Sequence, residues 1–303
     1  MSEGSDLIQR FAAEVLAENP THRSFVESSL ASLSDAHRRE LLTYIGYCTD
    51  RGLSLGYLAS CYSTITIDIQ MEQIYFKRHK KYRYSTFKEV ADQVYYDDEY
   101  MKKYMYGLAL TYFLWPNHVA MQEFFVRTFP RGRRGSYLEI GPGHGYYLRR
   151  AADLGNFARM IGVDVSPASV ELSKDIMQYY GVDTAADIQI QQADFLQYAP
   201  DRGAFSCIVM GEVLEHVEDP AEFLRKIRDL SDPDTHIYVT TCTNAPAVDH
   251  IFLFSTLDEV EALAGDCGLA ITDRFVAPYN GKSVAECEAE RLPVNVAYVM
   301  RTQ

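Results

Sequence analysis

The sequence lacks any apolar run that approaches the roughly 20 residues needed for a membrane-spanning helix, so we expect no membrane partner. Its first residues also lack a basic segment followed by an apolar stretch, so we expect no secretory leader. The six cysteines are scattered and form no CxxC pair. This spacing indicates reduced thiols and predicts a cytoplasmic location.

Proline is scarce in the first part of the chain, where only Pro116 lies between Pro20 and Pro130. Apolar residues there recur at helical spacing, as in SFVESSLASL, HRRELLTYIGYC and HVAMQEFFVRTF. The pattern predicts an all-α N-terminal domain over residues 1–130. The stretch TITIDI (64–69) fits a strand or a helix, and its sequence alone leaves both open.

Positive charge is in short supply, because 29 basic residues face 42 acidic ones and the net charge is −13. The first 130 residues hold 14 basic and 16 acidic side chains, and the remainder hold 15 and 26. Such a field repels a phosphate backbone, so we expect no nucleic-acid partner. The one basic run, KRHKKYR (77–83), is interpreted as a solvated helix end.

After the linker PRGRRGS (130–136) the pattern changes, and short β-branched runs alternate with helical ones. Alternation of this kind predicts an α/β fold for a second domain, 131–303, with a mostly parallel sheet covered by helices on both faces. Seven strands can be counted. The last two are separated by a loop (279–293) for which we predict no helix, so we expect one of them to run antiparallel.

The stretch YLEIGPGHG (137–145) is rich in glycine but lacks the spacing of a dinucleotide-binding loop. That fingerprint would require a glycine where Tyr146 stands, and the third glycine comes one place early, at Gly145. An acidic residue, Glu139, stands two places before the first glycine. A different nucleoside is therefore the better interpretation.

Acidic residues end the next predicted strands, at Asp164, Asp194 and Glu212, with Phe195 directly after the second. Strand ends meet in one crevice of an open α/β sheet. We expect Asp164 to accept from ribose hydroxyls and Asp194 from an adenine amino group, with Phe195 over the ring. Because a pyrophosphate would be repelled here, the pattern favours an adenosine whose tail carries positive charge.

The motifs YLEIGPGHG, GVDVS, QQADF and GEVLEHVEDP occur in the order and spacing that resemble class I S-adenosylmethionine-dependent methyltransferases. The likeness covers about residues 135–245 and is greatest to the quinone-biosynthesis branch (methyltransferase types 11 and 25). It implies a seven-stranded Rossmann-like sheet with an antiparallel last strand, S-adenosylmethionine as donor and S-adenosylhomocysteine as product. The cofactor contacts that it implies are Glu139, Gly141, Pro142, Gly143, Gly145, Asp164, Val165, Ser166, Asp194, Phe195 and Glu212.

His216, within the last of these motifs, has three interpretations. It is a general base near the transferred methyl group, or it braces the strand and the cofactor. The spacing Glu212-x-x-Glu215-His216, with His250 later, also resembles the magnesium site of plant-type small-RNA 2′-O-methyltransferases, and such ligands suit iron or zinc equally. Glu-His is common in members without metal, so we place a metal at Glu215, His216 and His250 behind the other two.

The acceptor pocket must come from outside these motifs. Aromatic walls with few polar groups suit a small organic acceptor, although tyrosines also pack between helices. The segment YMYGLALTYFLWPNH (104–118) holds the one tryptophan, and in related enzymes the segment after strand five lines the acceptor site. The substrate-binding residues predicted here are Tyr106, Tyr112, Trp115, His118, Asn244 and His250.

These observations predict an enzyme that transfers a methyl group to an O, N or activated C atom of a small molecule, in specialised-metabolite biosynthesis. The helical half would be a lid, and its apolar faces make a homodimer a further expectation. Two alternatives remain open: a methyltransferase acting on RNA or protein, and a non-methylating member that uses the same cofactor seat.

Overall fold

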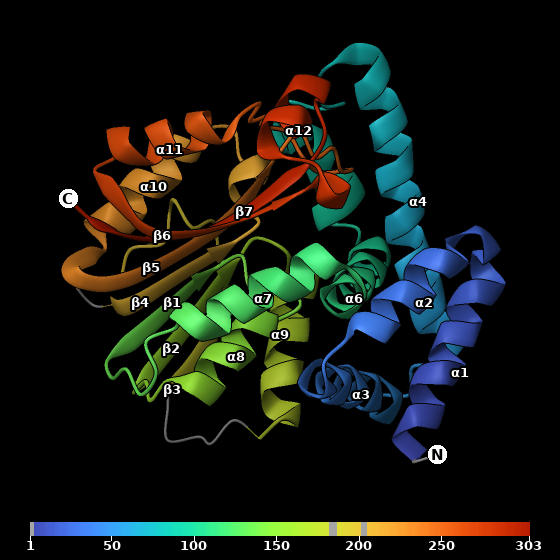
Figure 1. Cartoon of the computed structure of the whole chain (residues 1–303). Helices are drawn as coiled ribbons and strands as arrows, with labels where there is room; N and C mark the ends of the chain where they lie inside the picture. Colours follow the sequence, from blue (N-terminus) through green and yellow to red (C-terminus); the bar gives the residue numbers. More distant parts are fainter. Residues whose placement is uncertain (1–2, 182–186, 201–204) are drawn as a thin grey trace.

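The computed structural model describes residues 3–181, 187–200 and 205–303 of the 303-residue chain (Figure 1). Helices at the N-terminal side lie beside a twisted sheet that has helices on both faces. Over the described ranges, the structure contains no helix with the length and apolar character required to cross a membrane.

The N-terminal part is entirely helical, as predicted. The undecided stretch 64–69 lies inside the long helix α4, so its β-branched residues follow the helical neighbourhood. The elements are α1 (Glu3–Glu18), η1 (Pro20–His22), α2 (Arg23–Ser32), α3 (Asp35–Asp50), α4 (Leu55–His79), α5 (Phe87–Val90), η2 (Ala91–Tyr95), α6 (Asp98–Leu114) and α7 (Pro116–Thr128).

Local sequence signals begin and end these helices. Ser34 caps α3 by accepting from the amide of His37, and Asp97 caps α6 by accepting from Tyr100. Pro116 is the first residue of α7, where its missing N–H costs nothing. The helix α4 ends at His79, within the basic run 77–83, and the lysines and arginines of that run are exposed, as the sequence predicted for a solvated helix end.

The second part contains a seven-stranded sheet in the order β3-β2-β1-β4-β5-β7-β6. β7 runs antiparallel to both of its neighbours and the other pairings are parallel, which confirms the predicted Rossmann-like fold. The strands are β1 (Ser136–Ile140), β2 (Arg159–Asp164), β3 (Asp187–Gln192), β4 (Phe205–Gly211), β5 (Ser231–Thr243), β6 (Leu269–Pro278) and β7 (Val294–Thr302).

The expectation of a loop without a helix over 279–293 is wrong. Ser283 and Glu286 form a capping box that starts the short helix α12, and this signal was present in the sequence SVAE. The four longer helices of this part alternate with the strands, as the sequence predicted: α8 (Tyr146–Leu154), α9 (Pro167–Tyr179), α10 (Pro220–Asp229) and α11 (Leu257–Asp266). The shorter elements, which were not predicted, are η3 (Leu214–His216), η4 (Tyr279–Gly281) and α12 (Val284–Glu290).

Alternating strand residues divide the core between the two faces of the sheet. Leu138 and Ile208 point into a cluster that includes side chains of α10 and α11, whereas Tyr137 and Val209 point into a cluster with α8 and α9. Figure 1 shows these helix pairs on opposite sides of the sheet. The second cluster continues into α1, α3 and α6, so the helical part shares its core with one face of the sheet.

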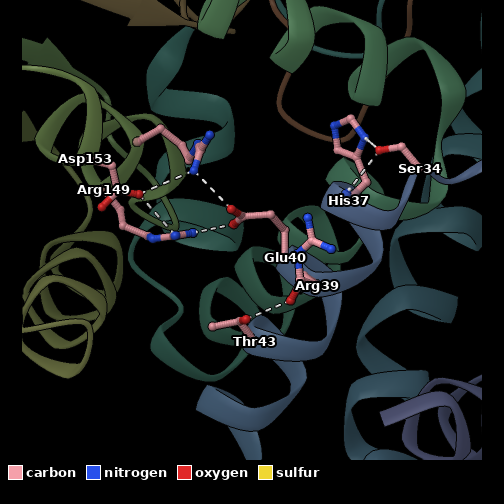
Figure 2. Close-up of polar contacts among 8 residues, drawn as sticks. Ser34, His37, Arg39, Glu40, Thr43, Arg149 and Asp153 are labelled. Carbon is pink, nitrogen blue, oxygen red and sulfur yellow. Dashed lines mark hydrogen bonds and ion pairs between the residues drawn. The ribbon is translucent and has the colours of Figure 1, made fainter. Parts of the chain in front are cut away.

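Polar contacts also join the two parts (Figure 2). Glu40 of α3 accepts from Arg149 at 2.7 Å and from Arg150 at 3.0 Å, both on α8. Nearer the sheet, the Tyr238 hydroxyl of β5 donates to the carbonyl of Met121 in α7. The boundary predicted at residue 130 stays a prediction, because α7 lies before it and packs on the sheet.

Some of the surface of α4 is apolar. Ile67, Met71 and Ile74 are about half exposed and lie on one side of the helix. A homodimer stays a prediction. All six cysteines lie in the described ranges, where they are buried and form no disulfide.

Candidate active site

A cavity of about 1500 Å³ lies at the carboxyl ends of the strands, between the sheet and the N-terminal helices. It exceeds the roughly 300–1000 Å³ of an ordinary ligand pocket. We call its lining residues from Glu139 to His250 the floor, those from His22 to Ala120 the roof, and those from Ala277 to Asn295 the end wall. The two halves of the chain therefore build one cavity.

The glycine loop after β1 lies in the floor. Gly141 and Gly143 have φ of 65° and 56°, a conformation that favours glycine, and both line the cavity with Pro142. A Cβ on Gly141 would lie 2.7 Å from a methyl group of Val213. The predicted contact Gly145 lies behind the lining, where a Cβ would meet Ile176 of α9 at 2.7 Å. Its role in the structure is close packing between α8 and α9.

Asp164 ends β2 and holds the loop in place. Its two carboxylate oxygens accept from the amides of Gly143 at 3.1 Å and Ser166 at 2.9 Å. The side chain is 8% exposed, and burial raises its pKa to about 6 despite these hydrogen bonds. Val165 lines the cavity, whereas Ser166 is fully buried and caps α9.

Glu139 and Glu212 bring two further carboxylates to the floor. Glu139 is 2% exposed, accepts a short hydrogen bond from the Tyr137 hydroxyl, and has its pKa raised by burial to about 8. Glu212 has φ of 52°, and its Oε1 is buried with no hydrogen-bond partner. Burial raises its pKa as well. Buried carboxylates with unmet hydrogen-bonding capacity suit a cationic ligand.

Asp194 and Phe195 lie in the turn after β3, and both line the cavity. Asp194 accepts from the amide of Leu196 at 2.8 Å. Phe195 is only 2% exposed, its ring lies 5.5 Å from that of Phe223, and the ammonium of Lys226 lies 4.9 Å from its centre. Most of the Phe195 ring therefore belongs to the core beneath the floor.

His216, the predicted base, lies in the floor within a network that the sequence did not reveal. Its Nδ1 is 3.0 Å from the Tyr95 hydroxyl, and 3.2 and 3.3 Å from the carbonyl and carboxylate oxygens of Asp249. Tyr95 and Tyr104, both from the roof, donate to the Asp249 carboxylate at 3.2 and 3.5 Å. A proton on Nδ1 shared with Asp249 would leave Nε2 as the acceptor atom.

The residues missed here are Tyr95, Tyr104 and Asp249. Asp249 precedes the predicted His250, and the tyrosines lie in the Tyr-rich stretch from residue 95. Tyr95 ends a π-helical turn, an element often found at functional sites. No sequence period distinguishes these tyrosines from those that pack between helices, so only their position beside Asp249 singles them out.

Four of the six predicted substrate residues line the cavity: Tyr112, Trp115, His118 and His250. The other two lie behind the lining. Tyr106 packs edge-on against Tyr57 with ring centres 6.3 Å apart. Asn244 is 1% exposed and donates to the carbonyl of Ser255 at 2.8 Å.

Two groups of side chains offer donor atoms for a metal ion, each within 4.8 Å of one another: His216, Asp249 and His250, and Glu215, Cys242 and His250. The predicted candidates are thus divided between two groups that share His250. Glu215 is fully buried and already accepts from Thr241 at 2.7 Å. Imidazoles with a carboxylate facing the cavity suit a divalent cation, so the first group fits one.

Residues 117–272 match the model of a family described as "Methyltransferase domain". A ubiquinone biosynthesis O-methyltransferase of Xanthomonas axonopodis pv. citri is 29% identical over 131 residues, which is 43% of this chain and 52% of that protein. The enzyme with the same name from Pseudoalteromonas translucida is 26% identical over 110 residues, 36% of this chain and 44% of that protein. The chain thus spans about half the length of the curated relatives it matches.

Among solved structures, phosphoethanolamine N-methyltransferase 2 of Haemonchus contortus, in complex with phosphomonomethylethanolamine and S-adenosylhomocysteine, has a TM-score of 0.52 at 14% identity. The match covers 72% of this chain and 60% of that one. The [4+2]-cyclase SpnF has a TM-score of 0.50 at 15% identity, over 61% of this chain and 80% of that one. At such identities the likeness concerns the fold alone.

Proposed function

Since the chain belongs to the methyltransferase-domain family, whose class I members use S-adenosylmethionine, we propose that it transfers the methyl group of this donor to a small organic molecule held in the cavity. The observation that carries the proposal is the floor itself, where buried carboxylates surround a glycine loop that lines the cavity. The sulfonium and ammonium groups of the donor supply the positive charge that this floor lacks.

The residues at the strand ends would hold the donor. Gly141 and Gly143 would contact its amino-acid tail, Glu139 would attract its ammonium, and Asp164 would accept from its ribose hydroxyls. Asp194 would accept from the adenine amino group, and Glu212 would lie in the same floor as a further carboxylate for the positive charge.

The reaction is an in-line displacement in which the acceptor attacks the methyl carbon and the sulfur leaves as a neutral thioether. The protein contributes chiefly by holding the two reacting atoms about 3–3.5 Å apart and aligned. His216 takes the proton of an acceptor hydroxyl or amine on Nε2, while Asp249 fixes the orientation of the ring. The roof excludes water from the donor.

The curated relatives are named for O-methylation in ubiquinone biosynthesis, so a hydroxyl group on an aromatic ring is the first acceptor to test. A specialised metabolite with such a ring is equally compatible with the Tyr- and Trp-lined roof. Both acceptors are small organic molecules, and the described lining, with Lys88 as its one lysine or arginine, does not require them to carry a phosphate.

Calorimetric titration with S-adenosylmethionine and S-adenosylhomocysteine tests the donor seat. We expect Asp164→Ala to weaken binding by about 1–3 kcal/mol, because the ribose hydroxyls lose their buried acceptor. Asp187→Ala, an aspartate at the other end of the same sheet, is the matched control and should bind like the wild type. Equal affinities for Asp164→Ala and wild type would remove the proposed seat.

A divalent cation is the second candidate role for this part of the floor, because His216, Asp249 and His250 lie within 4.8 Å of one another. They would hold the ion, which would supply Lewis acidity towards an acceptor hydroxyl. Removing metals with EDTA and restoring magnesium, zinc or ferrous iron separates the two roles. If turnover survives EDTA, His216 accepts the proton of the acceptor without help from a metal. If turnover returns only when an ion is added, the ion activates the acceptor hydroxyl.

A further inference from the structure

The charged residues of the cavity are distributed unevenly between its walls. Among the described lining residues, the floor contains eight carboxylates and neither lysine nor arginine. The roof and the end wall contain no carboxylate, and Lys88 is their one lysine or arginine. The floor carboxylates are Glu139, Asp164, Asp194, Glu212, Glu218, Asp219, Glu222 and Asp249.

Burial makes four of the five histidines in the described lining, including His250, weaker bases than a free imidazole. Burial lowers the pKa of His118 in the roof to about 4 and that of His144 in the floor to about 3. Both rings are therefore uncharged at neutral pH. Burial lowers the pKa of His22, at the far end of the roof, as well.

Lys88 does not make an anion site either. It is exposed at the rim of the cavity, beside Phe87. The amide of Phe87, the residue before Lys88, donates to the carboxylate of Glu218 at 2.9 Å, so a floor carboxylate contacts the backbone beside this lysine. An anion near Lys88 would also meet Glu218.

The roof is instead built from rings and amides. Phe25 and Trp115 line it, with Gln70 and Gln73 on α4 and Asn117 at the start of α7. Asn117 donates to Asn295 of the end wall at 2.8 Å, which ties the roof to the sheet. Rings that can stack and amides that can both donate and accept bind uncharged molecules well.

Resting on the proposed methyl transfer, we propose that the acceptor carries no phosphate, sulfate or carboxylate group and presents an uncharged, ring-containing body to the roof. The cavity of about 1500 Å³ leaves room for such a body beside the donor. Phosphorylated metabolites, nucleotides, coenzyme A thioesters and nucleic acids are disfavoured by the same argument, because Lys88 at the rim is the one lysine or arginine in the described lining.

An acceptor without a phosphate would distinguish this protein from its fold neighbour in Haemonchus contortus, whose structure holds the phosphate-bearing phosphomonomethylethanolamine. The two share a fold, and the described lining here offers no cluster of basic side chains for a phosphate. Acceptor charge is therefore a property of the lining residues and does not follow from the sheet topology.

The test compares two fluorescent probes with the same ring system, 2-naphthol and 6-hydroxynaphthalene-2-sulfonate, binding to protein saturated with S-adenosylhomocysteine at neutral pH and low salt. We expect the sulfonate to bind about 10-fold more weakly or worse, because its charge faces the floor carboxylates across a poorly solvated cavity. Equal or tighter binding of the sulfonate would overturn the proposal, and so would failure of 2-naphthol to bind.

A second experiment introduces a positive charge into the roof. Gln73→Arg should strengthen sulfonate binding and reduce the difference between the probes by about 10-fold, because the new guanidinium faces the cavity. Gln178→Arg adds the same charge on the exposed face of α9 and is the matched control, for which no change is expected. An equal response of the two variants would show that overall charge, and not the roof, sets the preference.

The probe titrations are repeated without S-adenosylhomocysteine, after binding of that compound has been measured separately. Loss of S-adenosylhomocysteine binding alone would contradict the proposed function and leave the probe comparison intact. A reversed probe preference with normal S-adenosylhomocysteine binding would contradict the acceptor class alone.

Discussion

Among the described lining residues, the floor of the cavity carries eight carboxylates, whereas the roof across the same cavity carries none and offers rings and amides. The floor carboxylates up to Asp219 lie within a few residues of the end of a strand or the start of a helix, so their places depend on local chain geometry. The roof comes from helices up to about 100 residues apart along the chain, and its shape depends on how they pack. We infer that the floor binds the methyl donor, which is common to the family, and that the roof binds the acceptor that is specific to this protein.

The largest expected effect concerns His216, the proposed proton acceptor in the floor. His216→Ala should lower kcat by about 10²–10⁴ if the imidazole accepts the proton of the acceptor, and should leave S-adenosylhomocysteine affinity nearly unchanged. The exposed His79, stacked on Tyr75 at the end of α4, provides the control variant His79→Ala. Retained turnover together with a lower melting temperature would instead assign His216 a bracing role.

The buried carboxyl groups of the floor should make the stability of the ligand-free protein depend on pH. The pKa of Glu139 is raised to about 8, so between its ordinary value near 4.5 and pH 8 the native state holds a proton that the unfolded state has lost. The free energy of unfolding should therefore fall as pH rises through this window, by up to about 1.4 kcal/mol per pH unit.

Urea unfolding of wild type and Glu139→Gln at several pH values checks this. The variant should have a flatter profile, although Asp164, whose pKa is raised to about 6, adds a slope of its own at lower pH. Identical slopes above about pH 6 would mean that Glu139 is ionised in the native state. Because the two proteins differ only at Glu139, the difference between their profiles reports on this carboxyl group of the floor.

The integrity of the roof depends on one close helix crossing. A Cβ on Gly107 of α6 would lie 2.9 Å from the carbonyl carbon of Cys61 and from a side-chain carbon of Ile65, both on α4. Gly107→Ala should therefore destabilise the protein by about 1–3 kcal/mol. Gly46→Ala in α3, where nothing lies within 4 Å, should instead stabilise it by about 0.5–1 kcal/mol.

Denaturant melts measure both variants, and S-adenosylhomocysteine titration under folding conditions measures the floor separately. We expect Gly107→Ala to weaken binding of the neutral naphthol while the donor seat keeps its affinity. Equal loss at both sites would mean that roof and floor do not behave as separate surfaces.

The smallest expected effect concerns the joint between the two regions. Glu40 accepts from Arg149 and Arg150, and its side chain is 23% exposed (Figure 2). Glu40→Gln should cost about 1 kcal/mol of stability, and the loss should shrink as salt is added. Glu27→Gln, which breaks the exposed pair with Arg23, should cost less than about 0.5 kcal/mol. A Glu40 effect that does not respond to salt would assign the contact to packing.

The donor seat was accessible from sequence because its residues are local. Gly141, Asp164, Asp194 and Glu212 each stand at the end of a predicted strand, and parallel strands of one sheet bring their ends together. The same reasoning did not separate Gly145 and Ser166, which lie behind the lining, from their neighbours that face it. In a turn, adjacent residues can differ in whether they face the cavity or lie behind its lining.

The helix α12 and the network around Asp249 were missed for different reasons. The capping box at Ser283 and Glu286 is a local signal that the sequence contains. It was missed because the segment is short and bounded by prolines, which favoured a loop. The network around His216 joins Tyr95 to two residues more than 120 positions away, and no spacing along the chain encodes it. Tyr106 and Tyr112, one and a half turns apart on α6, likewise face different surroundings.

Strand and helix order and the acidic glycine-rich edge followed from the amino-acid order, because period, turn residues and parallel topology act over short distances. That the last strand runs antiparallel was implied by the resemblance to class I methyltransferases. Which tyrosines face the cavity, which groups surround His216, and the scarcity of basic side chains in the described lining were decided only when α4, α6 and α7 packed over the sheet. Side-chain direction in a shared core depends on every neighbour at once, and for that reason the acceptor's chemistry is readable only in three dimensions.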